Sequence, residues 1–211
     1  MTRWKVVRGQ AGYTLAEMLV VASVLAFIMG AMLSLLMSGS QTWVAGTNRA
    51  EAQQSSRLIL SRMVTDIRTA GWDPKATSSF PSIQALPAGQ TGFIISNDWS
   101  ANGSIETGAT VSVNGENRGE QITYDFVSGA LRRRETPVDG SAVPVTTAIS
   151  SITFTYRDAD DAVVTNPHLT ANALNIRTVE ITVTAAADHS SSSATSVLVT
   201  STSRARVRNR S

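Results

Sequence analysis

Cysteine is absent from the 211 residues, and only 16% of them are charged. The absence of cysteine excludes a disulfide framework, thiol nucleophiles and zinc sites built on thiolates. It does not assign a compartment, because an exported protein can also lack disulfides. The charged fraction lies below the roughly 25% of a typical soluble protein. The 42% hydrophobic content is nevertheless ample for a buried core, so we expect an ordered chain.

The chain also lacks an excess of positive charge outside its N-terminal end. The formal net charge is +2, but three of the 18 basic residues, Arg3, Lys5 and Arg8, stand near the N-terminus with no acidic residue beside them. The remainder is close to neutral, so the overall charge gives no support to nucleic-acid binding.

Motifs of catalysis are missing as well. The two histidines, His168 and His189, lie in polar, loop-like surroundings without a nucleophile motif, and no phosphate-binding glycine loop or cofactor fingerprint is present. We therefore expect a protein that is not an enzyme, with no catalytic residue, no metal site and no cofactor.

The most prominent feature that is present is one long apolar segment. Residues 18–37 carry no charge, and roughly 20 residues of helix span the hydrocarbon core of a bilayer. Basic residues precede this segment, and the first charge after it is Arg49. The positive-inside rule therefore predicts a single-pass membrane protein with a cytoplasmic N-terminus and an extracytoplasmic body.

The residues in front of the apolar segment form a recognisable motif. Residues 12–20 read Gly-Tyr-Thr-Leu-Ala-Glu-Met-Leu-Val and follow a short basic leader. This pattern resembles the prepilin motif of type IV pilins and pseudopilins. The resemblance implies that a prepilin peptidase cuts after Gly12 and that Tyr13 is then N-methylated as the new first residue. It also implies that Glu17 pairs with the α-amino group of a neighbouring subunit during assembly.

Glu17 has a physical reason to need a partner, because a carboxylate at the edge of an apolar helix is costly unless something satisfies it. The alternative partner is local. Thr14 as N-cap, with Glu17 three residues later, has the pattern of a capping box that satisfies free N–H groups at the helix start. The two roles can coexist.

A second, amphipathic stretch is expected to continue the helix beyond the membrane. Apolar residues recur at helical spacing over residues 49–70, and Gly71 and Pro74 predict an end near Ala70. The apolar face comprises Ile59, Met63, Ile67 and Ala70, with Leu60 and Val64 beside them.

After Gly71 the pattern changes to short β-prone runs separated by turn residues. The expected strands are residues 92–96, 110–113, 121–127, 130–135, 149–156, 173–184 and 196–207, and the expected loops are residues 97–103, 158–161 and 188–194. The clearest hairpin turns at Ser128-Gly129.

The fold class is accordingly α+β, similar to the type IV pilin-like fold. We expect a prepilin leader at residues 1–12 and a long N-terminal helix at residues 13–70 whose first half is transmembrane at about 18–37. A mainly antiparallel β-sheet head is expected at residues 71–211.

The aspartates Asp158, Asp160 and Asp161 could offer oxygens to calcium, but they lack the remaining ligands of an EF-hand loop. A solvated turn between two strands is the favoured interpretation.

Arginines form two further groups. Arg204, Arg206, Arg208 and Arg210 alternate, which would place them on one side of an edge strand, as a possible contact for an acidic neighbouring subunit, lipid headgroups or DNA. The alternative is a charged edge that resists stray strand pairing. Arginines 132–134 are consecutive, so they are not expected to form one patch.

One more stretch narrows the resemblance. Residues 66–72, Asp-Ile-Arg-Thr-Ala-Gly-Trp, are similar to the helix end of W-type minor pilins and J-type pseudopilins. The presence of Glu17 argues against the K-type pseudopilin. Many pilus members carry a disulfide, which this chain lacks.

The resemblance implies a structural subunit of the inner (cytoplasmic) membrane that later enters a filament, namely a minor pilin that initiates or caps type IV pilus assembly. Its alternatives are a J-type pseudopilin of type II secretion and a DNA-uptake pilus subunit. A more distant alternative is a membrane-anchored adhesin or receptor module that never polymerises. Expected partners are the prepilin peptidase, other minor and major pilins or pseudopilins, the inner-membrane assembly platform and the lipid bilayer, whereas nucleic acid is unsupported.

Overall fold

The structure is a computed structural model that describes residues 12–76, 79–146, 149–186 and 198–209. The chain divides into two compact units, Met1–Gly46 and Thr47–Ser211. Its elements are α1 (Leu15–Thr69), β1 (Ile83–Ala85), β2 (Thr91–Ser96), β3 (Val111–Val113), β4 (Glu116–Arg118), β5 (Gln121–Val127), β6 (Ala130–Thr136), β7 (Val143–Thr146), β8 (Ile149–Arg157), α2 (Thr170–Ala173), β9 (Thr178–Ala186) and β10 (Leu198–Arg206). The α+β fold class, with one long N-terminal helix and antiparallel sheets, is confirmed.

The part of α1 that belongs to the second unit buries the face expected from the sequence. Ile59, Met63, Ile67 and Ala70 are all at most 1% exposed, Leu60 is buried and Val64 packs against the core. The buried face also extends back through Asn48, Ala52 and Ser56. The hydrophobic pattern missed this extension because two of the three residues are polar and the third is small.

The C-terminal end of α1 is fixed by groups from distant parts of the chain. Gly71 adopts φ 77°, the left-handed conformation that ends many helices, and its N–H donates to the carbonyl of Ser96 at 2.9 Å. The side-chain amide of Asn209 donates to the carbonyls of Thr69 and Ala70 at 3.0 and 3.3 Å. The two bonds from Asn209 satisfy carbonyls at the helix end that have no partner within the helix.

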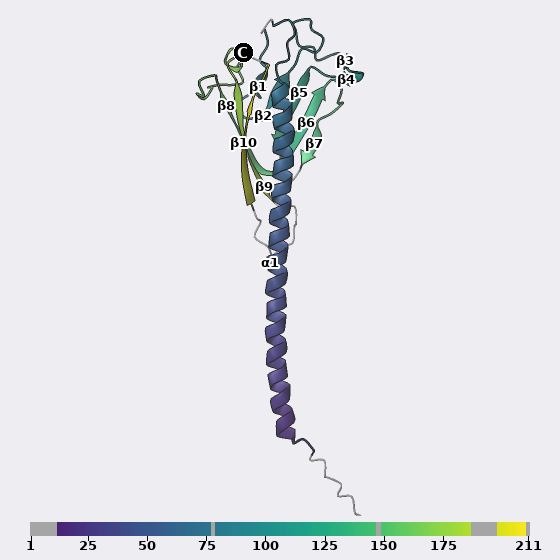
Figure 1. The fold of residues 1–211 in the computed structure, drawn as a ribbon, viewed down its shortest axis with the longest axis vertical. Helices are drawn as coiled ribbons and strands as arrows, with labels where there is room; N and C mark the ends of the chain where they lie inside the picture. The colour runs from purple at the N-terminus through teal and green to yellow at the C-terminus, as the bar shows by residue number, and fades with distance from the viewer. Residues whose placement is uncertain (1–11, 77–78, 147–148, 187–197, 210–211) are drawn as a thin grey trace, which may run out of the picture. The chain divides into compact units, whose positions relative to one another are not determined.

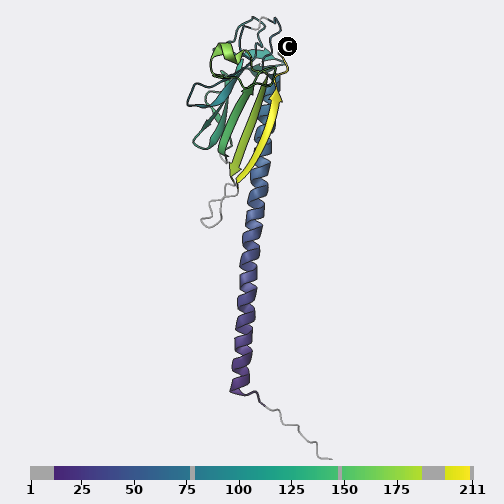
Figure 2. The same cartoon turned by 90° about the vertical axis from the view of Figure 1, so that its left-hand side faces the viewer.

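Over the described residues, the strands form three sheets in which all neighbours are antiparallel. Their orders are β1-β2-β5-β6-β7, β10-β9-β8 and β3-β4. Within the second unit, the end of α1 runs along the first two of these sheets (Figures 1 and 2). The antiparallel character was expected from the sequence, whereas the division among separate sheets was not.

The core lies between the helix and the two larger sheets. Phe93 of β2 is its centre, with its ring centroid 5.2 Å from that of Tyr124 of β5 and 5.0 Å from that of Phe154 of β8. The hydroxyl of Tyr156 donates to the carbonyl of Gly92 at 3.1 Å, which joins the three-stranded sheet to the five-stranded one. Aromatic packing and this bond therefore hold the two sheets together.

The expected hairpin is confirmed. Strands β5 and β6 pair from Gln121 with Thr136 to Val127 with Ala130. Ser128 and Gly129 have φ values of 51° and 80°, as a type I′ turn requires. Because the right-handed twist of the strands matches such a turn, the Ser-Gly pair sets the register of both strands.

The sequence analysis was wrong about some strands. Strands β1, β4 and β7 were not expected, because each has only three or four residues and no clear alternation. The strand expected from Ala173 begins only at Thr178. The preceding residues form the short helix α2 and a turn, in which Asn172 donates its side-chain amide to the carbonyl of Thr165 at 2.8 Å. The expected loop at residues 188–194 lies outside the described residues, as does His189.

Gly119 has no room for a side chain. A Cβ atom there would lie 2.0 Å from the carbonyl oxygen of Thr136, which is backbone and cannot turn away. We expect Gly119→Ala to lower the free energy of unfolding by about 1–3 kcal/mol. Urea unfolding of the detergent-solubilised chain measures this, with Gly140→Ala as control because nothing lies within 4 Å of its Cβ position. Equal unfolding midpoints for the two variants would contradict the prediction.

Candidate functional site

The first turn of α1 is closed by a reciprocal bond between Thr14 and Glu17. Glu17 Oε2 accepts hydrogen bonds from the backbone N–H and the hydroxyl of Thr14, each at 2.9 Å. The backbone N–H of Glu17 donates to Thr14 Oγ1 at 3.3 Å. This is the capping box that the sequence predicted. Within the described residues both bonds to the carboxylate end on Oε2, so Oε1 is open to a further donor.

The helix that follows exposes its apolar side chains throughout the first unit. Leu19, Phe27 and Leu36 are 64%, 80% and 68% exposed, and the other large apolar residues up to Met37 resemble them. Its mean hydropathy of 2.6 over 18 residues makes it long and apolar enough to cross a membrane. Such a surface is unfavourable in water, so it fits a bilayer or the apolar helices of neighbouring subunits.

Two residues, Gly12 and Tyr13, stand in front of the capped turn. Both are exposed, and Tyr13 retains 81% of its accessible surface. Among the described residues, no heavy atom lies within 4 Å of the position of a Cβ on Gly12. The peptide bond that joins them is therefore in an open segment directly before a membrane-compatible helix.

These features coincide with a known sequence family. Residues 7–33 match the family model of the prokaryotic N-terminal methylation motif. This match supports a type IV pilin-like or pseudopilin protein. The motif implies processing by a prepilin peptidase, methylation, and assembly with other pilins, and the family is structural in general. The apolar helix of this pilin-like protein fits a membrane anchor. No curated protein matches the chain.

A partly buried network of hydrogen bonds and ion pairs links the head of the pilin-like protein to α1. Asp66 Oδ2 accepts hydrogen bonds from the hydroxyl of Tyr124 at 2.7 Å and from Nε of Arg133 at 3.1 Å. Arg133 also donates from Nη2 to Glu135 Oε2 at 3.0 Å. Glu135 Oε1 in turn accepts from the backbone N–H of Gly119 at 3.0 Å. A helix residue is thereby linked to both strands of the central hairpin.

The network fixes the protonation of its members. Burial and the neighbouring Asp66 carboxylate raise the pKa of Tyr124, so its phenol stays neutral. Burial opposes the charge on Arg133, but hydrogen bonds to Glu135 and Asp66 outweigh it and raise the pKa of the guanidinium. Burial likewise opposes ionisation of Glu135, but the N–H of Gly119 and the neighbouring arginines hold its pKa below the ordinary value. All three groups keep one charge state at neutral pH.

The three consecutive arginines do not form one patch, as expected from strand geometry. Arg133 faces α1, whereas Arg132 faces away and forms an ion pair with Asp125. Arg134 is exposed, and its Nε donates to the carbonyl of Asp139 at 3.4 Å. No motif singled out Arg133 from its neighbours in advance. One signal was available. Alternate residues of a strand face the same side, so residue 133 shares the inward-facing side with Leu131 and Glu135.

The alternating arginines of the C-terminus lie at the expected edge strand, β10. Arg204 and Arg206 occupy exposed positions on the same side of this strand, and Arg208 is exposed beyond its end. Arg210 lies outside the described residues. Arg204 is engaged within the head, with Nη2 2.8 Å from Glu180 Oε2 and Nη1 3.6 Å from Asp161 Oδ2. Its charge is thus partly neutralised locally, which weakens the basic stripe.

The aspartates at residues 158–161 form the expected turn. Oδ1 of Asp158 accepts hydrogen bonds from the backbone N–H groups of Asp160 and Ala162 at 3.0 and 2.9 Å, so it organises the turn itself. Across the described residues, no group of three or more acidic, histidine or cysteine side chains is placed to hold a metal ion. His168 is half-buried, and its carbonyl accepts a hydrogen bond from Gln84 at 2.6 Å.

Residues 97–103 were recognised from sequence only as a loop, and two buried carboxylates organise this part of the chain. Asp98 within the loop and Glu120 directly before β5 are both 0% exposed. Asp98 accepts from the N–H of Gly103 at 2.7 Å, and Glu120 accepts from the N–H groups of Ser100 and Glu106 at 2.8 and 2.7 Å. Buried carboxylates require such donors, so these bonds define the loop conformation. The sequence offered no periodic signal for them.

Proposed function

We propose that this pilin-like protein is a minor pilin that initiates or caps the assembly of a type IV pilus. The observation that carries the proposal is the start of α1, where Glu17 keeps one carboxylate oxygen open beside a fully exposed apolar helix. A neighbour's α-amino group could donate to Oε1 while Oε2 continues to cap the helix. In a bilayer, such a charge-assisted pair is much stronger than in water.

The proposed maturation defines the parts of the molecule. Cleavage after Gly12 removes the leader at residues 1–12, and Tyr13 becomes the methylated first residue. The long helix at residues 13–70 then anchors the subunit in the inner membrane, with the head at residues 71–211 on the extracytoplasmic side. The basic leader and the apolar helix support this orientation. Assembly would involve the other pilins and the inner-membrane platform.

The helix end fits the branch that contains W-type minor pilins and J-type pseudopilins. Asp66 and Trp72, which carry the resemblance to W-type minor pilins and J-type pseudopilins, both have defined roles in the head. Asp66 fastens α1 to the hairpin, and the N–H of Trp72 donates to Asn97 Oδ1 at 3.1 Å where the chain leaves the helix. The J-type pseudopilin and the DNA-uptake subunit share these features and are the alternatives.

Processing distinguishes a filament subunit from an anchored adhesin. We expect the mature protein to begin at N-methyl-Tyr13, because the open Gly12–Tyr13 bond precedes the apolar helix. Intact-mass measurement of membrane-extracted protein tests this. Gly12→Ala should still be cleaved, whereas Gly12→Val should accumulate as precursor because its branched side chain crowds the peptidase site. A wild-type product that retains Arg3 and Lys5 would refute the proposal.

The proteins with which this chain assembles would identify the filament system to which it belongs. Cross-linking in intact cells, followed by mass spectrometry of the proteins that co-purify, should recover minor and major pilins. Recovery of type II secretion pseudopilins instead would assign the protein to the alternative.

A further inference from the structure

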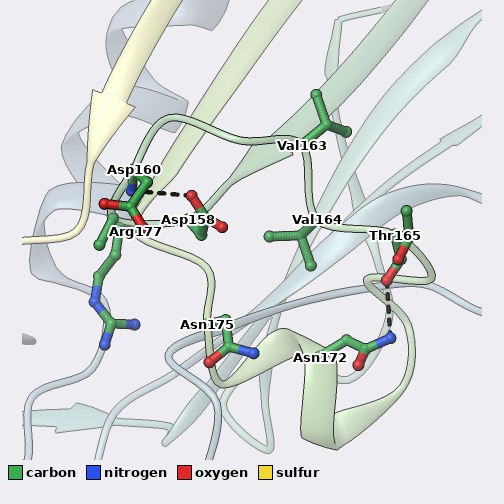
Figure 3. A pocket seen from close by; sticks show the side chains of 9 residues that line it. Asp158, Asp160, Val163, Val164, Thr165, Asn172, Asn175 and Arg177 are labelled. Carbon is green, nitrogen blue, oxygen red and sulfur yellow. Dashed lines mark hydrogen bonds between the residues drawn. The ribbon is translucent and has the colours of Figure 1, made fainter.

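A polar hollow lies on the head between the turn after β8 and the segment that contains α2 (Figure 3). Its volume is about 380 Å³, near the lower end of the roughly 300–1,000 Å³ typical of small-ligand sites. It belongs entirely to the second unit, and all of its lining residues are described. Neither the helix motif nor the network around Asp66 involves it.

Three polar groups in this hollow have hydrogen-bonding capacity left over. Oδ1 of Asp158 is used by the turn, but across the described residues Oδ2 accepts no hydrogen bond. The amide nitrogen of Asn172 is used by the carbonyls of Thr165 and Asn166, which leaves its oxygen available. Asn175 is exposed, and its carboxamide offers both a donor and an acceptor. Figure 3 shows these side chains around one space, with Val164 directed into it.

The local structure holds these groups in place before any ligand arrives. The N–H bonds from Asp160 and Ala162 fix the Asp158 carboxylate, and the two carbonyls fix the orientation of the Asn172 carboxamide. The α2 segment is tied to the end of β8 by the bond from the N–H of Arg177 to the carbonyl of Arg157 at 2.8 Å. Preorganised groups lower the entropic cost of binding a small molecule.

The chemistry of the lining selects a class of ligand. An anion is disfavoured because Asp158 and Asp160 both line the hollow, while the guanidinium of Arg177 is directed to the carbonyls of Leu174 and Ile176. A wholly apolar ligand would leave these polar groups unsatisfied. The lining instead suits a neutral molecule that has several hydroxyl groups and a non-polar face of C–H groups.

We propose that this hollow binds a neutral saccharide of one or two rings. Hydroxyl groups donate to Asp158 Oδ2 and Asn172 Oδ1, the carboxamide of Asn175 bonds a further hydroxyl, and the C–H face of the ring packs on Val164. The proposal concerns a ligand of the head and is independent of whether the protein enters a filament.

Saturation-transfer NMR on the full chain tests the proposal. The chain is solubilised in lauryldimethylamine oxide, whose head group is not a sugar, and methyl α-glucoside, methyl β-galactoside and N-acetylglucosamine are the probes. At least one probe should receive saturation. Asn175→Ala removes an exposed side chain that makes no hydrogen bond within the described residues, and Asp158→Asn keeps the turn-forming oxygen while it replaces Oδ2 by a donor. Each should weaken binding of that probe about tenfold.

Matched variants outside the hollow serve as controls. Asp161→Asn makes the same chemical change in the same turn, but the Asp161 carboxylate faces Arg157 and Arg204. Asn117→Ala removes an exposed asparagine from β4. Both should bind like the parent. The proposal is overturned if none of the three sugars receives saturation, or if the Asn175→Ala and Asp158→Asn proteins bind like the controls. Binding of calcium alone at Asp158, without any effect of the sugars, would also overturn it.

Discussion

Replacing Glu17 by glutamine is expected to reduce incorporation of the protein into filaments by about tenfold or more while its amount in the membrane stays near the parental level. Glutamine preserves the shape of the side chain and can still accept hydrogen bonds from Thr14. It cannot form a charge-assisted pair with a neighbour's α-amino group. Loss of a charge from an apolar helix should ease insertion, so the defect should appear only at assembly.

The measurement compares co-purification with the other pilins against membrane abundance and N-terminal processing. Thr14→Ala is the matched variant, because it removes the hydroxyl of the capping box while Glu17 keeps its charge. This variant should assemble much better than Glu17→Gln. If Glu17→Gln protein disappears from the membrane, or enters filaments as well as the parent, the carboxylate serves only as a helix cap.

The second large effect is expected at the link between α1 and the head. Asp66→Ala removes the acceptor of the Tyr124 hydroxyl and leaves the largely buried Arg133 with Glu135 and Asp139 as its remaining partners. Removal of one partner of a buried ion pair commonly lowers the free energy of unfolding by about 3–5 kcal/mol when the other charge is left uncompensated. Because Glu135 still compensates Arg133, we expect a loss at the lower end of this range, about 3 kcal/mol, for Asp66→Ala.

Urea unfolding of the detergent-solubilised chain, followed by tryptophan fluorescence, measures this loss. Asp66→Ala combined with Arg133→Met should be less destabilising than the sum of the single changes, because the double variant removes both charges of this contact while Glu135 keeps its bonds to Arg118 and Gly119. Asp125→Ala tests the neighbouring ion pair with Arg132, which faces away from α1 on the same hairpin. This control should have a smaller effect, because its partner Arg132 is partly exposed, so that solvent screens the pair. Equal destabilisation by Asp66→Ala and Asp125→Ala would show that the buried contact has no special role.

Local patterns in the sequence were sufficient to predict the helix and its first turn. The apolar run, the capping pair Thr14 and Glu17, and the stop at Gly71 all act within a few residues, so their geometry follows from spacing alone. The hairpin at Ser128-Gly129 was predictable for the same reason. The short strands β1, β4 and β7 were not, because three or four residues carry too little periodicity and pair only when longer neighbours present an edge.

Contacts between residues that lie far apart in the sequence determined the other features of the head. Residue spacing could not show that Asp66 meets Tyr124 and Arg133, because 58 and 67 positions separate them. The same holds for Asn209, which reaches the end of α1 across 140 positions. The sequence by itself determined an apolar helix that requires a membrane or neighbouring subunits, because hydrophobicity is a property of each residue. Only the tertiary structure decided which charges of the head are buried and which groups surround the hollow at Asp158, because burial depends on what packs against each side chain.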